Sequence, residues 1–382
     1  MTRRTTFLAL SLLATGCTGM DPVRPTHETC IAAVAYSGAD LRAPLPATAT
    51  RLIPEARSGL TGSETEALTR AFDTALTATG APSLSVAVWQ SGGDPWTARH
   101  GTPPGTLHYW ASVGKMVTAA AILRLTEDGR LSLDDPISAY VEGVPNGDVI
   151  TLRMLLDHTS GLYSANEDPI VRSNALWLDR EGLLEVVTRR PPYACPGAAW
   201  RYSNSGYTLL GYVVEDVTGE TYHRAATDLV LSRSAARAIR ILAPDDPMTD
   251  VAVPGGGTDR PALGLRAHQG AGGVVADAES MALFLRDLLA GRIVSQPTVA
   301  DMTADLYPMF QEGLWYGLGL MVYDVPDTNG GAVWIGHSGG VPGARALVAY
   351  DPDRAAIVAV AMTGEGSSEA TANLLFNALE AE

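Results

Sequence analysis

The stretch SVGKMVTAAAIL, residues 112–123, holds the one lysine of this 382-residue chain, Lys115, three positions after Ser112. All other strongly basic side chains are arginines. Arginine supplies a fixed positive charge, but a guanidinium with a pKa above ~12 does not lose its proton. The single lysine therefore indicates a position where the side chain has to become neutral.

Ser112 and Lys115 have the spacing of a nucleophile and its base. The apolar side chains within residues 117–125 predict a buried helix, which Gly129 ends. Residues three apart share a helix face, so the two side chains can meet if the helix begins at Ser112. Burial and the positive end of the helix would both lower the pKa of the lysine. A neutral amine can then take the serine proton, as in known Ser-x-x-Lys pairs.

The two ends of the chain predict strands and flanking helices. A capping box at residues 63–66 opens a helix, and the apolar alternation of residues 84–88 predicts a strand. Residues 96–100 are its expected hairpin partner, and residues 367–379 form an amphipathic helix. Four consecutive strands are expected between these ends, at residues 315–323, 332–336, 344–350 and 356–362.

The middle of the chain, from about residue 130 to 275, has the pattern of helices joined by long loops. Two short helices are expected there at residues 152–156 and 205–218, and a third follows at 277–290. We therefore expect an α/β fold. An antiparallel sheet is built from both chain ends, is flanked by the terminal helices, and carries an inserted, mostly helical lobe.

The amino terminus has the pattern of an export signal. Arg3 and Arg4 precede the apolar residues 5–14, and Ala14-Thr15-Gly16 leads to Cys17. This resembles a bacterial lipoprotein signal in which Cys17 is lipidated, with plain secretory cleavage as the alternative. We expect residues 1–17 to be the signal, 18–60 a flexible tether and 61–382 the domain. The expected location is the periplasm or cell envelope.

Composition limits the partners. The hydrophobic content of 46% allows a large core, and the net charge of −15 disfavours nucleic acid as a partner. No histidine pair has metal-ligand spacing, so we expect no metal and no cofactor. We expect a monomer whose only membrane attachment is a lipid on Cys17. Cys30 and Cys195 either form a disulfide, which an oxidising compartment permits, or stay unpaired.

Two further motifs follow Ser112 and Lys115 along the chain. Tyr202-Ser203-Asn204 precedes a predicted helix, and His337-Ser338-Gly339 lies on a predicted strand. The three motifs in this order resemble the serine β-lactamase and penicillin-binding-protein superfamily. So do the stretches 155–162 (LLDHTSGL), 197–207 (GAAWRYSNSGY) and 271–275 (AGGVV). The resemblance is closest to class C β-lactamases, D-alanyl-D-alanine carboxypeptidases and related esterases.

The resemblance implies a β-lactamase-like fold and a role for each motif residue. Ser112 would be the acylated nucleophile, and Lys115 and Tyr202 would share the proton transfers. Asn204 would hydrogen-bond the substrate amide. The remaining implied residues bind the substrate carboxylate or the oxyanion: His337, Ser338 and Gly339 at the pocket edge, and the N–H groups of Ser112 and Gly340 in the oxyanion hole.

One departure from the class C pattern affects the expected substrate. Class C enzymes have Lys-Thr-Gly where this chain has His337-Ser338-Gly339, which weakens the β-lactamase interpretation. We expect an exported serine hydrolase acting on D-Ala-D-Ala-type peptides, β-lactams or small esters. The alternative is a penicillin-binding-like module that is acylated without turnover or only binds cell-wall peptide.

Three other features of the sequence, residues 336–340, His158 and His268, are weaker indications of a site. Residues 336–340 also fit the Gly-x-Ser-x-Gly pattern of α/β-hydrolases, but a strand rather than a helix follows them. His158 is interpreted as structural, and His268 as a solvated loop residue.

Overall fold

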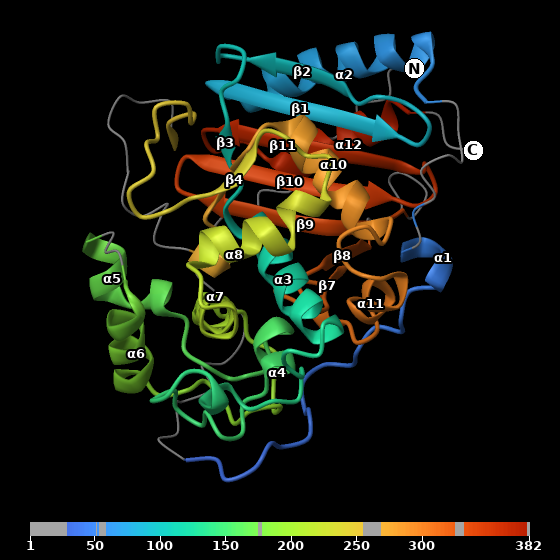
Figure 1. Cartoon of the computed structure of the whole chain (residues 1–382). Coiled ribbons are helices and arrows are strands. Elements are labelled where there is room, and N and C mark those ends of the chain that lie inside the picture. Colours follow the sequence, from blue (N-terminus) through green and yellow to red (C-terminus); the bar gives the residue numbers. More distant parts are fainter. Residues whose placement is uncertain are drawn as a thin grey trace.

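An eight-stranded antiparallel sheet forms the centre of the fold (Figure 1). The computed structural model describes residues 29–50, 52, 59–174, 178–254, 269–324 and 332–379. The strand order is β2-β1-β11-β10-β9-β8-β7-β6. Their bounds are β1 Ser83–Gln90, β2 Trp96–His100, β6 Tyr307–Pro308, β7 Leu314–Tyr316, β8 Met321–Asp324, β9 Val333–Val341, β10 Ala344–Asp351 and β11 Ala356–Thr363.

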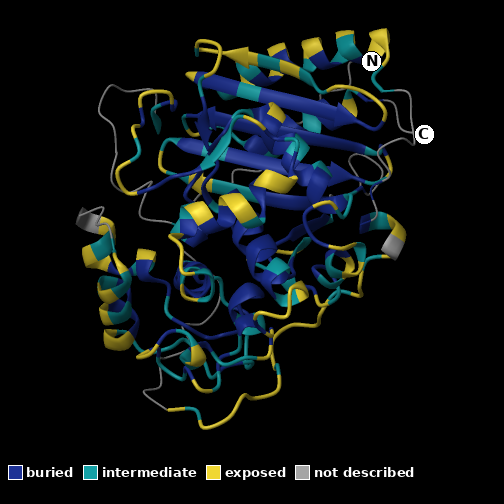
Figure 2. Cartoon of the chain, in the orientation of Figure 1, coloured by how far each residue is buried: buried dark blue, intermediate teal, exposed yellow. Residues whose placement is uncertain are grey.

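Both chain ends contribute to this sheet, which confirms the predicted fold class. Strand β1 pairs with β2 on one side and with β11 on the other, where Val86 lies opposite Val360. Side chains alternate across a strand, so Val86 and Val88 face one core and Ala87 and Trp89 face another. Because both faces are covered, the central strands are mostly apolar, and Figure 2 shows them largely buried.

The two faces are covered by different helices. Helices α2 (Gly62–Thr79) and α12 (Ser368–Asn377) pack together on one face, and α10 (Ala278–Leu289) packs on the other. Helix α10, expected at residues 277–290, begins after Asp277, whose side chain accepts a hydrogen bond from the Ser280 N–H and so caps the helix.

The helical lobe lies below the sheet in Figure 1. Its buried centre is α3 (Lys115–Glu127), which contacts α7, α8 and α9. A second sheet, in the order β3-β5-β4, joins the lobe to the strands. The remaining elements are α1 Ala47–Thr50, α4 Leu152–Leu156, α5 Pro169–Asn174, α6 Arg180–Arg189, α7 Asn204–Thr218, α8 Tyr222–Leu229, α9 Gln269–Gly272, α11 Gln296–Asp301, β3 His108–Tyr109, β4 Ile239–Ile241, β5 Val274–Ala276 and the 3-10 helices η1 Ala111–Gly114, η2 Ile137–Ala139, η3 Ala165–Glu167 and η4 Leu231–Arg233.

Two predicted elements differ in the structure. The capping box of α2 is formed by Thr61 and Glu64 rather than at residues 63–66, because the Thr61 side chain accepts from the Glu64 N–H. The single strand predicted at 315–323 is the hairpin of β7 and β8. Gly319 turns the chain there with a φ of 78°, a conformation that favours glycine.

Residues 29–50 lie against the domain, so the predicted tether is wrong for this part of the chain. Cys30 and Cys195 form a disulfide, which settles the alternative left open by the sequence. The backbone N–H of Val34 donates to Pro196 O at 2.9 Å, and Arg42 pairs with Asp324 at 2.8 Å. The amino-terminal segment is therefore fixed at both the lobe and the sheet.

The predicted signal, with Cys17, and the first part of the tether lie outside the described residues. Among the residues that are described, no helix combines the length and the apolar character needed to cross a membrane.

Candidate active site

Ser112 lies in a tight turn between strand β3 and helix α3. The turn is the 3-10 helix η1, and the α-helix begins at Lys115 rather than at Ser112 as expected. A 3-10 helix has three residues per turn, so residues i and i+3 lie above one another and the pair still meets. Ser112 is partly exposed, whereas Lys115 is 0% exposed. The hydroxyl is thus accessible and its neighbour is not.

Two glycines allow other backbone segments to touch this turn. A Cβ on Gly339 of β9 would lie 2.4 Å from Trp110 O and 2.7 Å from Ser112 N. A Cβ on Gly272 would lie 2.6 Å from Ala111 O. Any side chain at either position would push the segment away, so glycine is what brings the backbone of β9 next to the Ser112 N–H.

The amine of Lys115 contacts three oxygen atoms. Its Nζ lies 3.1 Å from Ser112 Oγ, 2.6 Å from Asn204 Oδ1 and 2.6 Å from Ala271 O. Burial holds the pKa of Lys115 well below its ordinary value. A neutral amine has two N–H groups and one lone pair. The two carbonyl-type oxygens accept the N–H groups, and the lone pair then faces the Ser112 hydroxyl.

Tyr202 approaches the same hydroxyl from the loop before α7. Its side chain hydrogen-bonds Ser112, and its ring centroid lies 4.9 Å from Lys115 Nζ. Burial raises the pKa of Tyr202, and the hydrogen bond with Ser112 offsets only part of that effect. The phenol is therefore protonated at neutral pH. Tyr202 therefore reaches the Ser–Lys pair. Asn204, which the resemblance implied as a ligand of the substrate amide, contacts Lys115.

His337 lies on the buried side of β9, next to the site but enclosed. Its Nδ1 lies 2.6 Å from Ser338 O and its Nε2 lies 3.2 Å from the Tyr316 hydroxyl. Burial lowers the pKa of His337 to about 3, so the ring is neutral. Both nitrogens are engaged and the residue is 0% exposed. This arrangement does not agree with the expected direct contact between His337 and a substrate carboxylate.

The rest of the His337-Ser338-Gly339 segment offers a strand edge. Strand β8 pairs with β9 only up to Gly336, so among the described residues β8 leaves the edge of 337–341 open. Ser338 and Gly340 point to the opposite side from His337 and Gly339. Ser338 is partly exposed and Gly340 is exposed. An open strand edge is the usual place for an extended ligand to pair.

An aromatic rim continues from Tyr202. Phe310, between β6 and β7, is 55% exposed and lies with its ring 5.7 Å from Tyr202 and 5.4 Å from Trp200. An exposed aromatic ring beside a polar site offers apolar contact to a ligand.

Two parts of this site were not predicted. The carbonyl of Ala271 binds Lys115, although its stretch was singled out for its resemblance alone. Tyr316 was placed on a strand without a role, since the sequence does not show which hydroxyl reaches a buried histidine.

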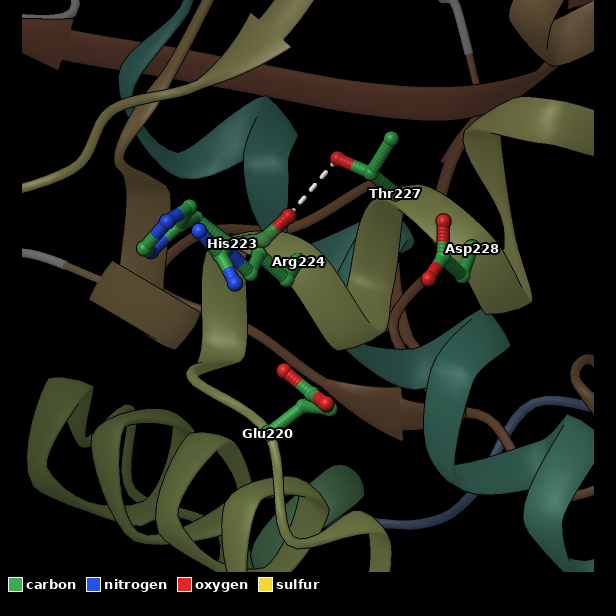
Figure 3. Close-up of a pocket in the computed structure, with 5 residues that line it drawn as sticks. All are labelled: Glu220, His223, Arg224, Thr227 and Asp228. Carbon is green, nitrogen blue, oxygen red and sulfur yellow. Dashed lines mark hydrogen bonds between the residues drawn. The ribbon is translucent and has the colours of Figure 1, made fainter.

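A separate surface hollow lies on the helical lobe (Figure 3). It has a volume of about 400 Å³ and contains none of the site residues above. Within it, the Thr227 hydroxyl donates to His223 O at 2.6 Å. Its lining combines acidic, basic and neutral polar groups: Glu220, His223, Arg224, Thr227 and Asp228. This mixture indicates no particular ligand.

Other expectations fall outside the site. His268 lies outside the described residues. Within the described part of the chain, no group of three His, Cys, Asp or Glu side chains is placed to hold a metal ion.

Comparison with known proteins gives one family and several relatives. The family model described as Beta-lactamase matches residues 68–382. "Putative penicillin-binding protein PbpX" of Bacillus subtilis (strain 168) is 38% identical over 122 residues, which are 32% of this chain and 29% of that protein. "Protein flp" of Staphylococcus aureus (strain MW2) is 34% identical over 132 residues, 33% of this chain and 26% of that protein. The chain thus matches less than a third of the length of these curated relatives.

Solved structures match over more of the chain. A D-stereospecific amidohydrolase from Streptomyces sp. is 28% identical with a TM-score of 0.71, covering 82% of this chain and 98% of that chain. A D-amino acid amidase from Ochrobactrum anthropi SV3 in complex with L-phenylalanine amide is 20% identical, with a TM-score of 0.73 and coverage of 83% and 98%. A penicillin binding protein from Bacillus halodurans is 23% identical, with a TM-score of 0.66 and coverage of 77% and 94%. The last two likenesses concern the fold alone.

Proposed function

Because this chain belongs to the Beta-lactamase family, we propose that it is an exported serine hydrolase that forms an acyl-enzyme on Ser112. The observation that carries the proposal is the 3.1 Å contact between the accessible Ser112 hydroxyl and the fully buried Lys115 amine. A buried amine with a lowered pKa is a base at neutral pH, whereas an exposed lysine is charged and cannot accept a proton.

Acylation begins with the transfer of the Ser112 proton to the lone pair of Lys115 Nζ. The serine oxygen bonds to the substrate carbonyl carbon, and the N–H groups of Ser112 and Gly340 stabilise the oxyanion that forms. The amide nitrogen of Asn204 then faces the substrate, because the Asn204 oxygen is already bound to Lys115.

The leaving group departs with a proton from Tyr202. The raised pKa of Tyr202 keeps the phenol protonated at neutral pH, so its proton is available when the leaving nitrogen becomes strongly basic. The tyrosinate regains a proton from protonated Lys115, which restores the neutral amine. In deacylation a water molecule takes the place of the leaving group and passes its proton through Tyr202 to Lys115 as its oxygen bonds to the acyl carbon. The bond to Ser112 Oγ then breaks, Lys115 returns the proton to that oxygen, and a carboxylic acid is released.

The substrate class is a small amide or peptide with an apolar residue of D-configuration at the acyl side. The name of the Streptomyces relative, a D-stereospecific amidohydrolase at 28% identity, supports this class. The neutral, enclosed His337 offers no fixed cation, which disfavours substrates that depend on a carboxylate contact, such as β-lactams. The exposed Phe310 beside Tyr202 suits an apolar side chain.

Turnover of four substrates by the purified protein tests the proposal. The panel contains a D-phenylalanine amide, a D-Ala-D-Ala peptide, nitrocefin and a short-chain nitrophenyl ester. We expect the amide and the ester to be turned over, and Ser112→Ala to abolish both activities. The proposal would be overturned if none of the four substrates were turned over, or if Ser112→Ala turned them over as fast as the unsubstituted protein.

The second candidate is a penicillin-binding-like module that is acylated without turnover. A fluorescent penicillin distinguishes the two. Stoichiometric labelling of Ser112 with no product release on any substrate of the panel would favour the module, whereas steady product release eliminates it.

Export is part of the proposal, with Cys17 as the lipidated residue. The Cys30–Cys195 disulfide supports an oxidising compartment. Cell fractionation of the intact chain and of Cys17→Ala tests it. The intact chain is expected with the membrane and the variant in the soluble envelope fraction; recovery of both in the cytoplasm contradicts export.

A further inference from the structure

His158 has a backbone conformation that few residues adopt. It follows α4 with a φ of 66°, in the left-handed region that suits glycine and that other residues, mainly asparagine, aspartate and histidine, adopt only occasionally. It is also 1% exposed, which is unusual for an imidazole at the end of a short helix. A strained conformation that persists in a buried residue indicates that the surrounding contacts require it.

The contacts of His158 bracket Tyr202. Its backbone carbonyl accepts a hydrogen bond from the Arg201 N–H at 2.9 Å. Its ring Nδ1 accepts another from the Ser203 N–H at 3.3 Å. The residues immediately before and after Tyr202 are therefore both bound to His158. The imidazole centroid also lies 4.3 Å from the Tyr202 ring, so one residue fixes the tyrosine through its backbone and its ring.

The His158 ring packs against neighbouring rings and accepts a hydrogen bond, and it does not transfer a proton. Burial lowers its pKa well below the ordinary value. In the neutral ring Nδ1 is the acceptor, so Nε2 carries the hydrogen. Nε2 has no hydrogen-bond partner among the described residues, and the ring lies 5.1 Å from Tyr207 and 4.6 Å from Tyr316.

We propose that His158 is a positioning residue that fixes the Tyr202 hydroxyl against Ser112. This inference rests on the proposed function, in which Tyr202 donates the proton to the leaving group. His158 itself touches neither Ser112 nor the substrate. Its role is to restrict the loop before α7, so that the phenol stays in the geometry that proton transfer requires.

The test compares two substrates that differ in their need for a proton donor. An amide nitrogen has to be protonated as it leaves, whereas a nitrophenolate leaves without a proton. His158→Ala is expected to lower the acylation rate with the amide by roughly 10- to 100-fold, with a much smaller loss of the acylation rate with the nitrophenyl ester and little change in KM. A merely structural role would lower both activities together, in proportion to the folded fraction.

Two further substitutions separate the contributions of His158. Asparagine adopts positive φ readily and its Oδ1 can accept from the Ser203 N–H, so His158→Asn should recover most of the amide activity. His158→Phe keeps a ring without the acceptor and should resemble His158→Ala. If the alanine variant does not fold, the comparison of amide activity between the asparagine and phenylalanine variants still tests the positioning role.

Asn146 offers a matched control. It has a φ of 56°, and its side chain Oδ1 accepts a hydrogen bond from the distant Cys30 N–H at 3.0 Å. Asn146→Ala removes the same kind of contact and should lower stability without changing the amide-to-ester ratio.

The Tyr202→Phe variant distinguishes a failure of this inference from a failure of the proposed function. If Tyr202→Phe changes the amide-to-ester ratio and His158→Ala does not, the positioning role is wrong while the proton donor stands. If Tyr202→Phe leaves the ratio unchanged, the donor role of Tyr202 is itself wrong, and the positioning role is overturned with it.

Discussion

At the scale of single residues, the proposed function depends on the burial of Lys115, which lowers the pKa of its amine. It is the one lysine of the chain, it is fully buried, and its amine has two carbonyl-type acceptors and one hydroxyl within 3.1 Å. No carboxylate touches it in the described structure, so the charged form is not stabilised by an ion pair. Burial without a counter-ion is what makes this amine a base.

Lys115→Arg is expected to lose activity by at least roughly 10²-fold on every substrate, because a guanidinium stays charged and cannot accept the serine proton. Steady-state kinetics on the ester, corrected for the folded fraction by circular dichroism, measures the loss. Retention of most of the activity would mean that only the positive charge is needed.

Asp157, next to His158, has a pKa raised to about 7 by burial, although Thr159 donates two hydrogen bonds to it. A raised carboxyl pKa means that the folded state holds a proton that the unfolded state has lost. This contribution to stability is complete below about pH 4 and is lost as the pH rises towards 7, at up to about 1.4 kcal/mol per pH unit.

Asp157→Asn should therefore remove that pH dependence, because the amide oxygen can accept the same two hydrogen bonds without ionising. Urea unfolding at pH 5 and pH 8 measures the free energy of unfolding of both proteins. The difference in favour of the variant should be larger at pH 8 than at pH 5. An equal change at both pH values would show that Asp157 does not titrate in this window.

The sequence predicted that Ser112 and Lys115 meet, and the resemblance added Tyr202. Neither showed that Asn204 contacts Lys115 or how these residues are enclosed. Ser112, Lys115, Tyr202 and Asn204 could be found because their types and order are unusual. The burial of His337 could not, because a strand residue can face either side, and only the position of Tyr316 and η1 decides which side is closed.

At the scale of elements, the contact between β9 and η1 builds the site. A Cβ on Gly339 would meet only backbone or backbone-attached atoms within 3.1 Å, and these cannot move aside as a flexible side chain can. The strand and the nucleophile turn are therefore held at a separation that no other residue allows.

Gly339→Ala is expected to push β9 from the Ser112 N–H and lower kcat/KM by roughly 10²-fold, as the loss of an oxyanion donor does. The stability cost should be about 1–3 kcal/mol. Gly62→Ala is the matched control, because nothing lies within 4 Å of a Cβ there. Equal activity of the two variants would contradict the role given to Gly339.

Elements were predicted well where periodicity and caps agree, as for α4, α10 and β11. They were predicted poorly where glycine interrupts an apolar run. The stretch 315–323 reads as one strand, yet Gly317 and Gly319 make a turn in which Gly317 N–H donates to Leu320 O at 2.9 Å. Alternation alone does not distinguish a long strand from a tight hairpin.

At the scale of the whole molecule, the amino-terminal segment contacts both the helical lobe and the large sheet. The composition of residues 18–60 indicated a tether, because Pro, Thr and Ala without periodicity are typical of linkers. Long-range contacts override that pattern over residues 29–50, and sequence composition carries no information about them.

The Cys30–Cys195 disulfide spans 165 positions, so its removal frees a long loop in the unfolded state. The double variant Cys30→Ser, Cys195→Ser should lose about 2–5 kcal/mol of unfolding free energy while keeping its activity. Urea unfolding measures this loss. A reductant should lower the free energy of unfolding of the original chain but not that of the variant. Identical unfolding midpoints would contradict a stabilising disulfide.

The most direct test of the whole mechanism uses the fact that the chain has one lysine. Lysine labelled with 13C at Cε gives a single side-chain NMR signal, which needs no assignment. Its titration in the folded protein should have a midpoint well below the value of about 10.4 expected for the urea-unfolded chain. A folded midpoint equal to or above the unfolded one would show a charged amine at neutral pH and contradict the account.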